Sequence, residues 1–113
     1  MNSERLVPFE DVESLVWLWA KRKGITGKEN AHTQMGKMLE EVMELDKEVG
    51  LNDIPAIKDE LGDVLVTCIV QAACHGLDPV ECLQGAYEKI RKRKGDTVNG
   101  VFIKDMEVAH DAG

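Results

Sequence analysis

The sequence predicts an all-α protein with a four-helix bundle-like fold, which a second copy of the chain completes and a short C-terminal tail or hairpin follows. The 113 residues fit one domain, 1–113, with a helical core at about 9–94 and a tail at 95–113. Aromatic residues are only 4% of the chain, so the core must be aliphatic, which suits helices packed on helices. Apolar residues also recur at helical spacing in four stretches.

The first predicted helix covers about residues 9–23 and ends at Gly24, with cations in its last turn. Its apolar face is expected to contain Phe9, Val12, Leu15, Val16 and Trp19. The second helix starts between residues 29 and 33 and ends near Val49, with Gly50 as the stop signal. Its apolar stripe is expected to contain Met35, Met38, Val42, Leu45 and Val49.

The third predicted helix begins after Asn52-Asp53, which offer capping oxygens, and runs to about His75. Pro55 fits its first turn, and Gly76 ends it. Its middle is apolar nearly all round, which is typical of a buried central helix. Four helices of this size cover such a helix incompletely, so we expect a homodimer or a dimer of dimers.

The fourth predicted helix starts at Asp78-Pro79, an N-cap followed by proline at the first helical position, and runs to about Lys94. Gly95 is expected to end it. In the tail, Asn99-Gly100 lies between apolar β-forming residues, which indicates a short hairpin.

The net charge of −7 makes nucleic acid an unlikely partner, because duplex-binding proteins carry a dominant basic patch. No apolar run has the length of a membrane span, and no signal-type stretch follows the first residues. Three cysteines without paired spacing indicate neither a disulfide framework nor a zinc site, and we expect them to be buried. These features predict a cytoplasmic protein.

Two acidic clusters carry the chemical signal. Glu40, Glu41 and Glu44 lie on the second predicted helix, and Glu60 and Asp63 lie on the third. Residues three apart are neighbours on a helix surface, so each cluster contains a carboxylate pair. The pair on the third helix is more informative, because carboxylates on an otherwise apolar helix are costly unless a partner or a metal neutralises them.

Lys58 is one candidate partner for the third helix's acids. The alternative is that the two acidic helices face each other with a cation between them, and oxygen ligands without Cys or His suit Mg²⁺ or Mn²⁺. The predicted metal ligands are Glu41, Glu44, Glu60 and Asp63. Glu40 flanks these ligands. It is a candidate for orienting or deprotonating the attacking water, or for holding a second metal. The competing interpretation is that Glu40 is simply an exposed glutamate on the helix surface.

The basic run at the end of the fourth helix places Lys89, Lys92 and Arg93 on one side. Phosphate binding and compensation of the helix dipole explain this run equally well. Trp17 and Trp19 cannot face the same way, so one is expected in the core while the other stacks a base or seals a subunit interface.

The order Glu-Glu-x-x-Glu, spacer, Glu-x-x-Asp resembles the signature of MazG-like nucleoside triphosphate pyrophosphohydrolases. This all-α superfamily also includes dimeric dUTPases and phosphoribosyl-ATP pyrophosphohydrolase. The resemblance spans roughly residues 9–94, with Gln34 and Lys37 ahead of the first motif and Leu61-Gly62-Asp63-Val64-Leu65 within the second.

The resemblance implies cleavage of a nucleoside triphosphate between its α and β phosphates, with Mg²⁺ held by the four predicted ligands. It also implies that Lys37, Lys89 and Arg93 stabilise the phosphates, and that the protein is a dimer or a dimer of dimers. Among the substrate-binding candidates we include Lys92 and Trp17. Two alternatives stay open: a sibling enzyme acting on another nucleotide such as phosphoribosyl-ATP, and a non-catalytic helical dimerisation module.

Overall fold

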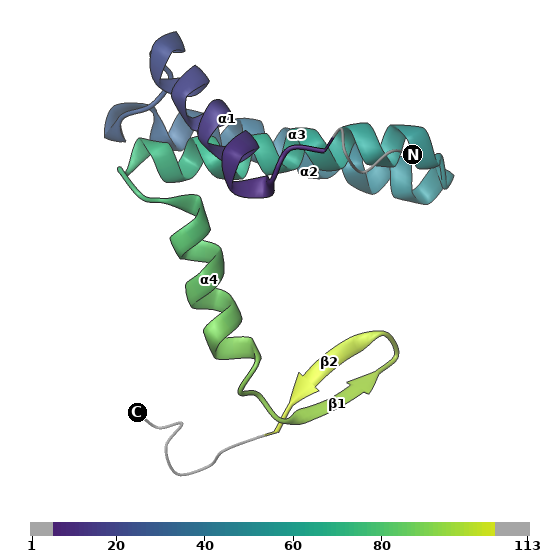
Figure 1. Ribbon diagram of the computed structural model, residues 1–113. Coiled ribbons are helices and arrows are strands. Elements are labelled where there is room, and N and C mark those ends of the chain that lie inside the picture. The colour runs from purple at the N-terminus through teal and green to yellow at the C-terminus, as the bar shows by residue number, and fades with distance from the viewer. Residues whose placement is uncertain (1–5, 106–113) are drawn as a thin grey trace. The chain divides into compact units, whose positions relative to one another are not determined.

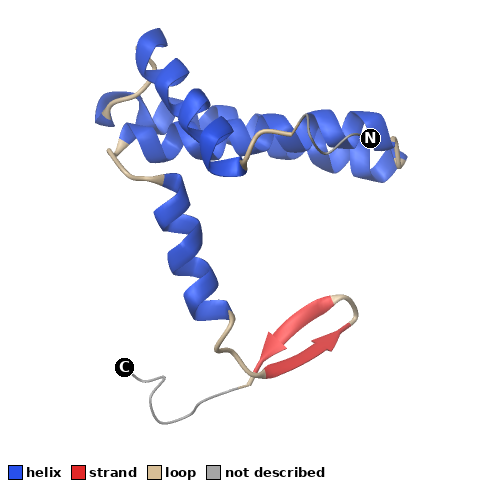
Figure 2. Ribbon diagram, viewed as in Figure 1, coloured by secondary structure: helices blue, strands red, loops and turns tan. Residues whose placement is uncertain are grey.

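The computed structural model describes residues 6–105, which form four α-helices, one short 3₁₀ helix and a hairpin of two strands (Figures 1 and 2). The elements are α1 (Phe9–Lys23), η2 (Lys28–Asn30), α2 (Ala31–Leu51), α3 (Ile54–Cys74), α4 (Pro79–Ile90), β1 (Gly95–Val98) and β2 (Val101–Lys104). The all-α prediction is confirmed. The chain divides into two units, Met1–Glu81 and Cys82–Gly113, which are described separately. The single-domain organisation and the homodimer stay predictions.

The first unit is built on α2 and α3, which form an antiparallel pair (Figure 1). Two residues join them. Asn52 adopts the left-handed conformation, φ 53°, and its N–H bonds to the last turn of α2. Asp53 then caps α3, accepting a hydrogen bond from the N–H of Ala56 at 3.1 Å. The prediction that Gly50 ends α2 is wrong, because asparagine also tolerates the left-handed conformation that closes a helix.

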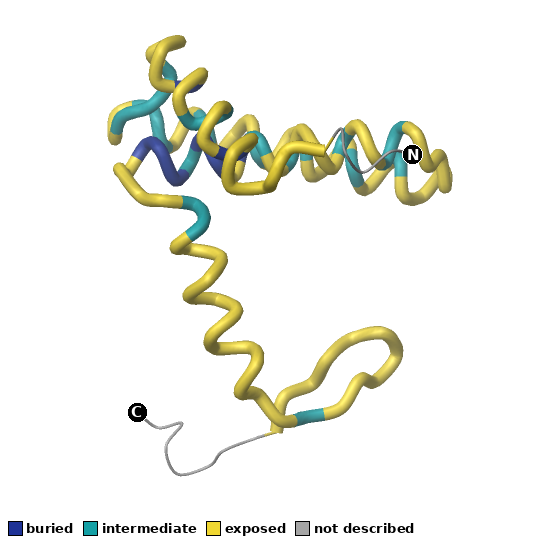
Figure 3. Tube along the Cα trace, in the orientation of Figure 1, coloured by how far each residue is buried: buried dark blue, intermediate teal, exposed yellow. Residues whose placement is uncertain are grey.

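α1 packs against the C-terminal half of α3. Ala20, Val70 and Cys74 form the buried cluster between them, and partly buried apolar side chains surround it. Gly24 ends α1 as predicted, with φ 72°. Figure 3 shows that the buried positions gather in this part of α3 and in α1. The core is therefore small and lies at one end of the α2–α3 pair.

The predicted apolar faces of three helices are partly or largely exposed. On α2 the exposed members of the stripe are Met35, Val42 and Val49. Val12 and Leu15 on α1 are exposed, because α1 turns the face of Glu13 and Ala20 towards α3 instead. On α3, Leu61 and Leu65 are 46% and 48% exposed, since α1 covers only the other half of that helix. The predicted burial of α3 on nearly all sides is therefore wrong for its N-terminal half.

The cysteines divide in the same way. Cys74 is buried in the core, while Cys68 and Cys82 are exposed, so the expectation of three buried thiols is correct only for Cys74. All three are unpaired.

Among residues 6–105, no single helix is long and apolar enough to cross a membrane. Only α3 and α4 taken together, with the break between them, have the length and composition of a span.

α4 begins in the last residues of the first unit, continues into the second, and is shorter than predicted. Asp78 caps its start, accepting from the N–H of Val80 at 2.8 Å, and Pro79 is its first residue. It ends at Ile90, four residues before the predicted end at Lys94.

Gly95 begins β1 rather than ending the helix. A β-carbon on Gly95 would collide with the backbone of Ile103 on the paired strand, so the close pairing requires glycine. Asn99 and Gly100, with φ 51° and 79°, form the turn between β1 and β2. The hairpin predicted from Asn-Gly is confirmed.

We expect Asp53→Ala to lower the free energy of unfolding by about 0.5–2 kcal/mol, because the substitution removes the side-chain cap of α3. Urea denaturation measures the change. Asp59→Ala is the matched control, since it removes the same charge from an exposed position inside the same helix. Equal losses in the two variants would show that the cap contributes nothing.

Candidate active site

The two acidic clusters face each other across the α2–α3 interface. Gln71 on α3 donates a hydrogen bond to the carbonyl oxygen of Ala31 at the start of α2, at 3.0 Å. Three helical turns earlier on α3, Glu60 lies beside Glu41 of α2. The antiparallel register therefore turns the polar stripe of α3 towards α2.

Three carboxylates meet at this interface. Glu41, Glu60 and Asp63 each offer an oxygen, and these oxygens all lie within 4.8 Å of one another. Glu41 and Glu60 are half-buried and Asp63 is exposed. The Oε2 atom of Glu60 is buried and has no hydrogen-bond partner among the described residues. Such an atom is costly unless a ligand satisfies it.

The pKa of Glu60 is raised to about 7. The largest cause is Glu41, whose carboxylate accepts a hydrogen bond from Glu60 only when Glu60 is protonated, and loss of solvent is the next. Two ionised carboxylates cannot make this bond, so it does not satisfy the Oε2 atom of ionised Glu60. The negative charges of Glu41, Asp63 and Glu44 raise this pKa further. Without a cation, the cluster therefore lowers its repulsion by keeping a proton on Glu60.

The cluster fits a divalent metal ion. Its donors are all carboxylate oxygens, the type that Mg²⁺ and Mn²⁺ prefer, and one of them is a buried oxygen without a partner. The described residues include no ion pair of Glu60 or Asp63 with Lys58 or any other cation. Lys58 therefore does not pair with these acids in the described part of the chain, and a cation between the facing helices stays a proposal.

Two other predicted acids lie outside the three-carboxylate group. Glu44 is exposed, and its charge acts on Glu60, but its oxygens are not within the cluster. Glu40 is on the solvent side of α2 and accepts a hydrogen bond from Lys37 at 3.2 Å, an exposed ion pair between neighbouring helical turns. Such a pair adds little stability.

A cavity of about 350 Å³ adjoins the cluster. It includes Glu41 and Asp63 and also the predicted substrate residue Lys37. Its apolar walls are Trp19, Ile25, Val66 and Val70, and its other polar walls are Thr33, Gln34 and Thr67. Trp19 is not among the predicted substrate-binding residues, because helical periodicity places it on an apolar face and does not tell which tryptophan contacts a base.

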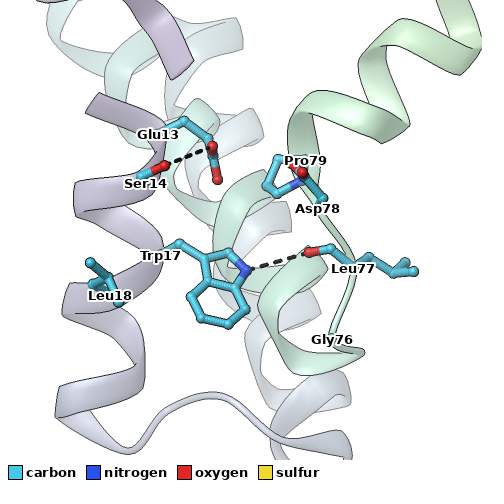
Figure 4. A pocket seen from close by; sticks show the side chains of 8 residues that line it. All are labelled: Glu13, Ser14, Trp17, Leu18, Gly76, Leu77, Asp78 and Pro79. Carbon is cyan, nitrogen blue, oxygen red and sulfur yellow. Dashed lines mark hydrogen bonds between the residues drawn. The ribbon is translucent and has the colours of Figure 1, made fainter. Parts of the chain in front are cut away.

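Trp17, which the sequence analysis assigned to the substrate, lines a different cavity of about 370 Å³ (Figure 4). Its indole N–H donates to the carbonyl oxygen of Leu77 at 3.3 Å. Glu13 and Asp78 line the same cavity. Burial raises the pKa of Glu13, and the nearby Asp78 adds to this effect. The structure thus separates the two tryptophans, and only Trp19 borders the cavity that contains Glu41 and Asp63.

The predicted phosphate-binding cations belong to the second unit. Lys89 is in the last turn of α4, while Lys92 and Arg93 follow the helix; all three are exposed. Lys92 and Arg93 lie in turns. The N–H of Lys92 donates to the carbonyl oxygen of Lys89, and the N–H of Arg93 donates to that of Ile90. The three side chains therefore do not share one helical face, contrary to the prediction.

A family model described as the MazG nucleotide pyrophosphohydrolase domain matches residues 29–98, more than half of the chain. The matched stretch contains all the acids of the two clusters and leaves out α1. Comparison with curated proteins and with solved structures found no significant match.

In the metal-free protein, we expect the free energy of unfolding to fall as the pH rises from about 4.5 to about 7. Glu60 has its ordinary pKa of 4.5 in the unfolded chain and a pKa of about 7 in the folded one. Between these two pH values the folded state binds a proton on Glu60 that the unfolded state has lost. The stabilisation from this proton is complete below the pKa of Glu60 in the unfolded chain, and it is lost as the pH rises past the pKa of Glu60 in the folded chain.

Urea denaturation in the presence of a chelator checks this dependence. Glu60→Gln should be less sensitive to pH over the same interval, because the amide does not titrate. Glu13 also has a raised pKa and stays in both proteins, so the difference between the two curves isolates Glu60. Identical curves would contradict the assignment.

Proposed function

Because the chain belongs to the MazG nucleotide pyrophosphohydrolase family, whose activity is that of hydrolases acting on phosphoric anhydrides, we propose that it cleaves nucleoside triphosphates. The reaction breaks the bond between the α and β phosphates and releases a nucleoside monophosphate and pyrophosphate. Ribo- and deoxyribonucleotides are both candidate substrates.

The observation that carries this proposal is the group formed by Glu41, Glu60 and Asp63, with its unsatisfied Glu60 oxygen. These three residues would hold Mg²⁺, or Mn²⁺ in its place, and Glu44 is the candidate for a fourth ligand. When bound, the ion neutralises phosphate charge and polarises the phosphoryl group towards attack by water.

The chain's own side chains supply the rest of the chemistry. Lys37 lines the adjoining cavity and is the candidate for attracting the phosphates. Glu40, which points to solvent beside the cluster, is the candidate for orienting the attacking water. Lys89, Lys92 and Arg93 of the second unit stay candidates for binding the phosphates.

We also propose that two copies associate. Val12 and Leu15 on α1, and Leu61 and Leu65 on α3, leave apolar side chains exposed on two helices. Exposed apolar side chains of this kind are available for association with a second copy. The unpaired cysteines suit a reducing compartment, so a cytoplasmic location remains part of the proposal.

Incubation with a panel of nucleoside triphosphates and Mg²⁺, followed by measurement of pyrophosphate, tests the activity. We expect Glu60→Gln to lower kcat/KM by more than about 100-fold, because it alters a direct metal ligand. Mg²⁺ should raise the Tm of the unmodified protein and leave that of Glu60→Gln unchanged. Release of pyrophosphate from no nucleotide would favour the binding-module alternative.

Glu40→Gln separates water handling from metal binding. If Glu40 handles the water, the variant loses about 10²- to 10⁴-fold in kcat and keeps the Mg²⁺-induced rise in Tm. An unchanged kcat would remove Glu40 from the mechanism, and loss of the Tm shift would make it a metal ligand.

For the proposed dimer, we expect Leu65→Lys to shift the protein towards a monomer, because a charge on the exposed apolar face of α3 must be desolvated on association. Sedimentation equilibrium measures the mass. Asp59→Lys, at an exposed polar position of the same helix, should leave the mass unchanged. A monomeric unmodified protein would rule out the dimer.

A further inference from the structure

The cavity beside the carboxylates has two kinds of wall. Glu41, Asp63 and Lys37 make it charged on one side, where metal and phosphate chemistry is proposed. Trp19 and Ile25 contribute aromatic and aliphatic surface from α1 and the segment after it. Its volume of about 350 Å³ falls within the range typical of small-molecule sites, about 300–1,000 Å³.

The spacing along α2 suits a nucleotide that lies along this helix. Gln34 precedes Glu41 by two turns, which places it about 10 Å away along the helix axis. Lys37 lies between them and lines the same cavity. A phosphate at the Glu41 end therefore leaves room for the sugar near Lys37 and for the base near Gln34.

Gln34 and Trp19 have the chemistry that a base requires. The side-chain amide of Gln34 is half-buried and makes no hydrogen bond with any described residue, whereas Gln71 uses its amide to bind the backbone of Ala31. A free amide offers a donor and an acceptor side by side, which matches the edge of a nucleobase. Trp19 is 40% exposed and offers an indole face for stacking.

The cavity of Trp17 is less suitable for a nucleotide. The indole N–H of Trp17 is already bonded to Leu77, and the ammonium of Lys21 lies over its ring, 5.1 Å from the centroid. The carboxyl groups of Glu13 and Asp78 share that cavity and oppose a polyanion. The two tryptophans are therefore not equivalent candidates.

We propose that the nucleobase of the substrate stacks on Trp19 and pairs through its edge with the amide of Gln34. This inference rests on the proposed function. It assigns base selection partly to α1, which lies outside the stretch that matches the family model. The phosphate end of the site belongs to the matched stretch, while the stacking surface is added by the N-terminal helix of this chain.

Two single-tryptophan proteins provide a matched test by fluorescence. Trp17→Phe retains only Trp19, and Trp19→Phe retains only Trp17. The probes are the monophosphates of adenosine, guanosine, cytidine and uridine and of the corresponding deoxynucleosides, and inorganic pyrophosphate, all with Mg²⁺. We expect at least one monophosphate to quench Trp17→Phe and to leave Trp19→Phe unchanged, while pyrophosphate quenches neither.

Kinetics give a second readout. Removal of the stacking surface in Trp19→Ala should raise KM about 5- to 150-fold with a smaller effect on kcat, and Trp19→Phe should recover part of this loss because it keeps an aromatic face. Gln34→Ala should reduce the ratio of kcat/KM values between the best and the worst base. The melting temperature of each variant reports whether it is folded.

The results separate this inference from the proposed function. Pyrophosphate release by Trp17→Phe without any base-dependent quenching of Trp19 would overturn the inference and leave the function standing. Equal quenching by pyrophosphate and by every monophosphate would also overturn it, since Trp19 would then sense phosphate alone. Base-dependent quenching without hydrolysis of any triphosphate would support the base site and overturn the proposed reaction. If Trp19→Ala does not fold, the fluorescence of Trp17→Phe still decides.

Discussion

The charge repulsion among Glu41, Glu60 and Asp63 is the constraint around which the first unit is arranged. Carboxylate oxygens of these three residues lie within 4.8 Å of one another, so their charges repel unless a proton or a cation compensates them. The metal-free chain meets this constraint with a proton, which explains why the pKa of Glu60 rises to about 7. A divalent cation meets the same constraint without the proton.

Such a cluster needs a rigid scaffold, and the α2–α3 pair provides it. The two-residue junction at Asn52 and Asp53 sets the direction of both helices, while the bond from Gln71 to Ala31 ties their opposite ends together. The carboxylates lie between these two restraints. The hydrophobic core lies at one end only, so the acids occupy a region where apolar packing contributes less. Exposed leucines on α3 are consistent with further burial against a second copy.

α1 contributes both to the hydrophobic core and to the wall of the cavity beside the carboxylates. Ala20 packs in the core, and its small side chain lets α1 approach α3 closely. Trp19, the preceding residue, then points to the cavity that contains Glu41 and Asp63, while Trp17 points to the junction before α4. One helix therefore anchors the fold through Ala20 and borders the proposed substrate site through Trp19.

The sequence by itself determined the helices, the hairpin turn and the acids worth examining, because these depend on local spacing, capping and backbone conformation. Helix caps and turns involve only residues that are close in the sequence, so the sequence is enough to predict them. Examples are Asp53, Gly24 and Asn99-Gly100. Only the tertiary structure decided which acids meet, since Glu44 and Glu41 have similar helical positions and differ in what faces them across α3. The same holds for Trp17 and Trp19. Their positions two residues apart on one helix cannot reveal which ring borders a cavity, because this depends on how α1 is rotated against α3.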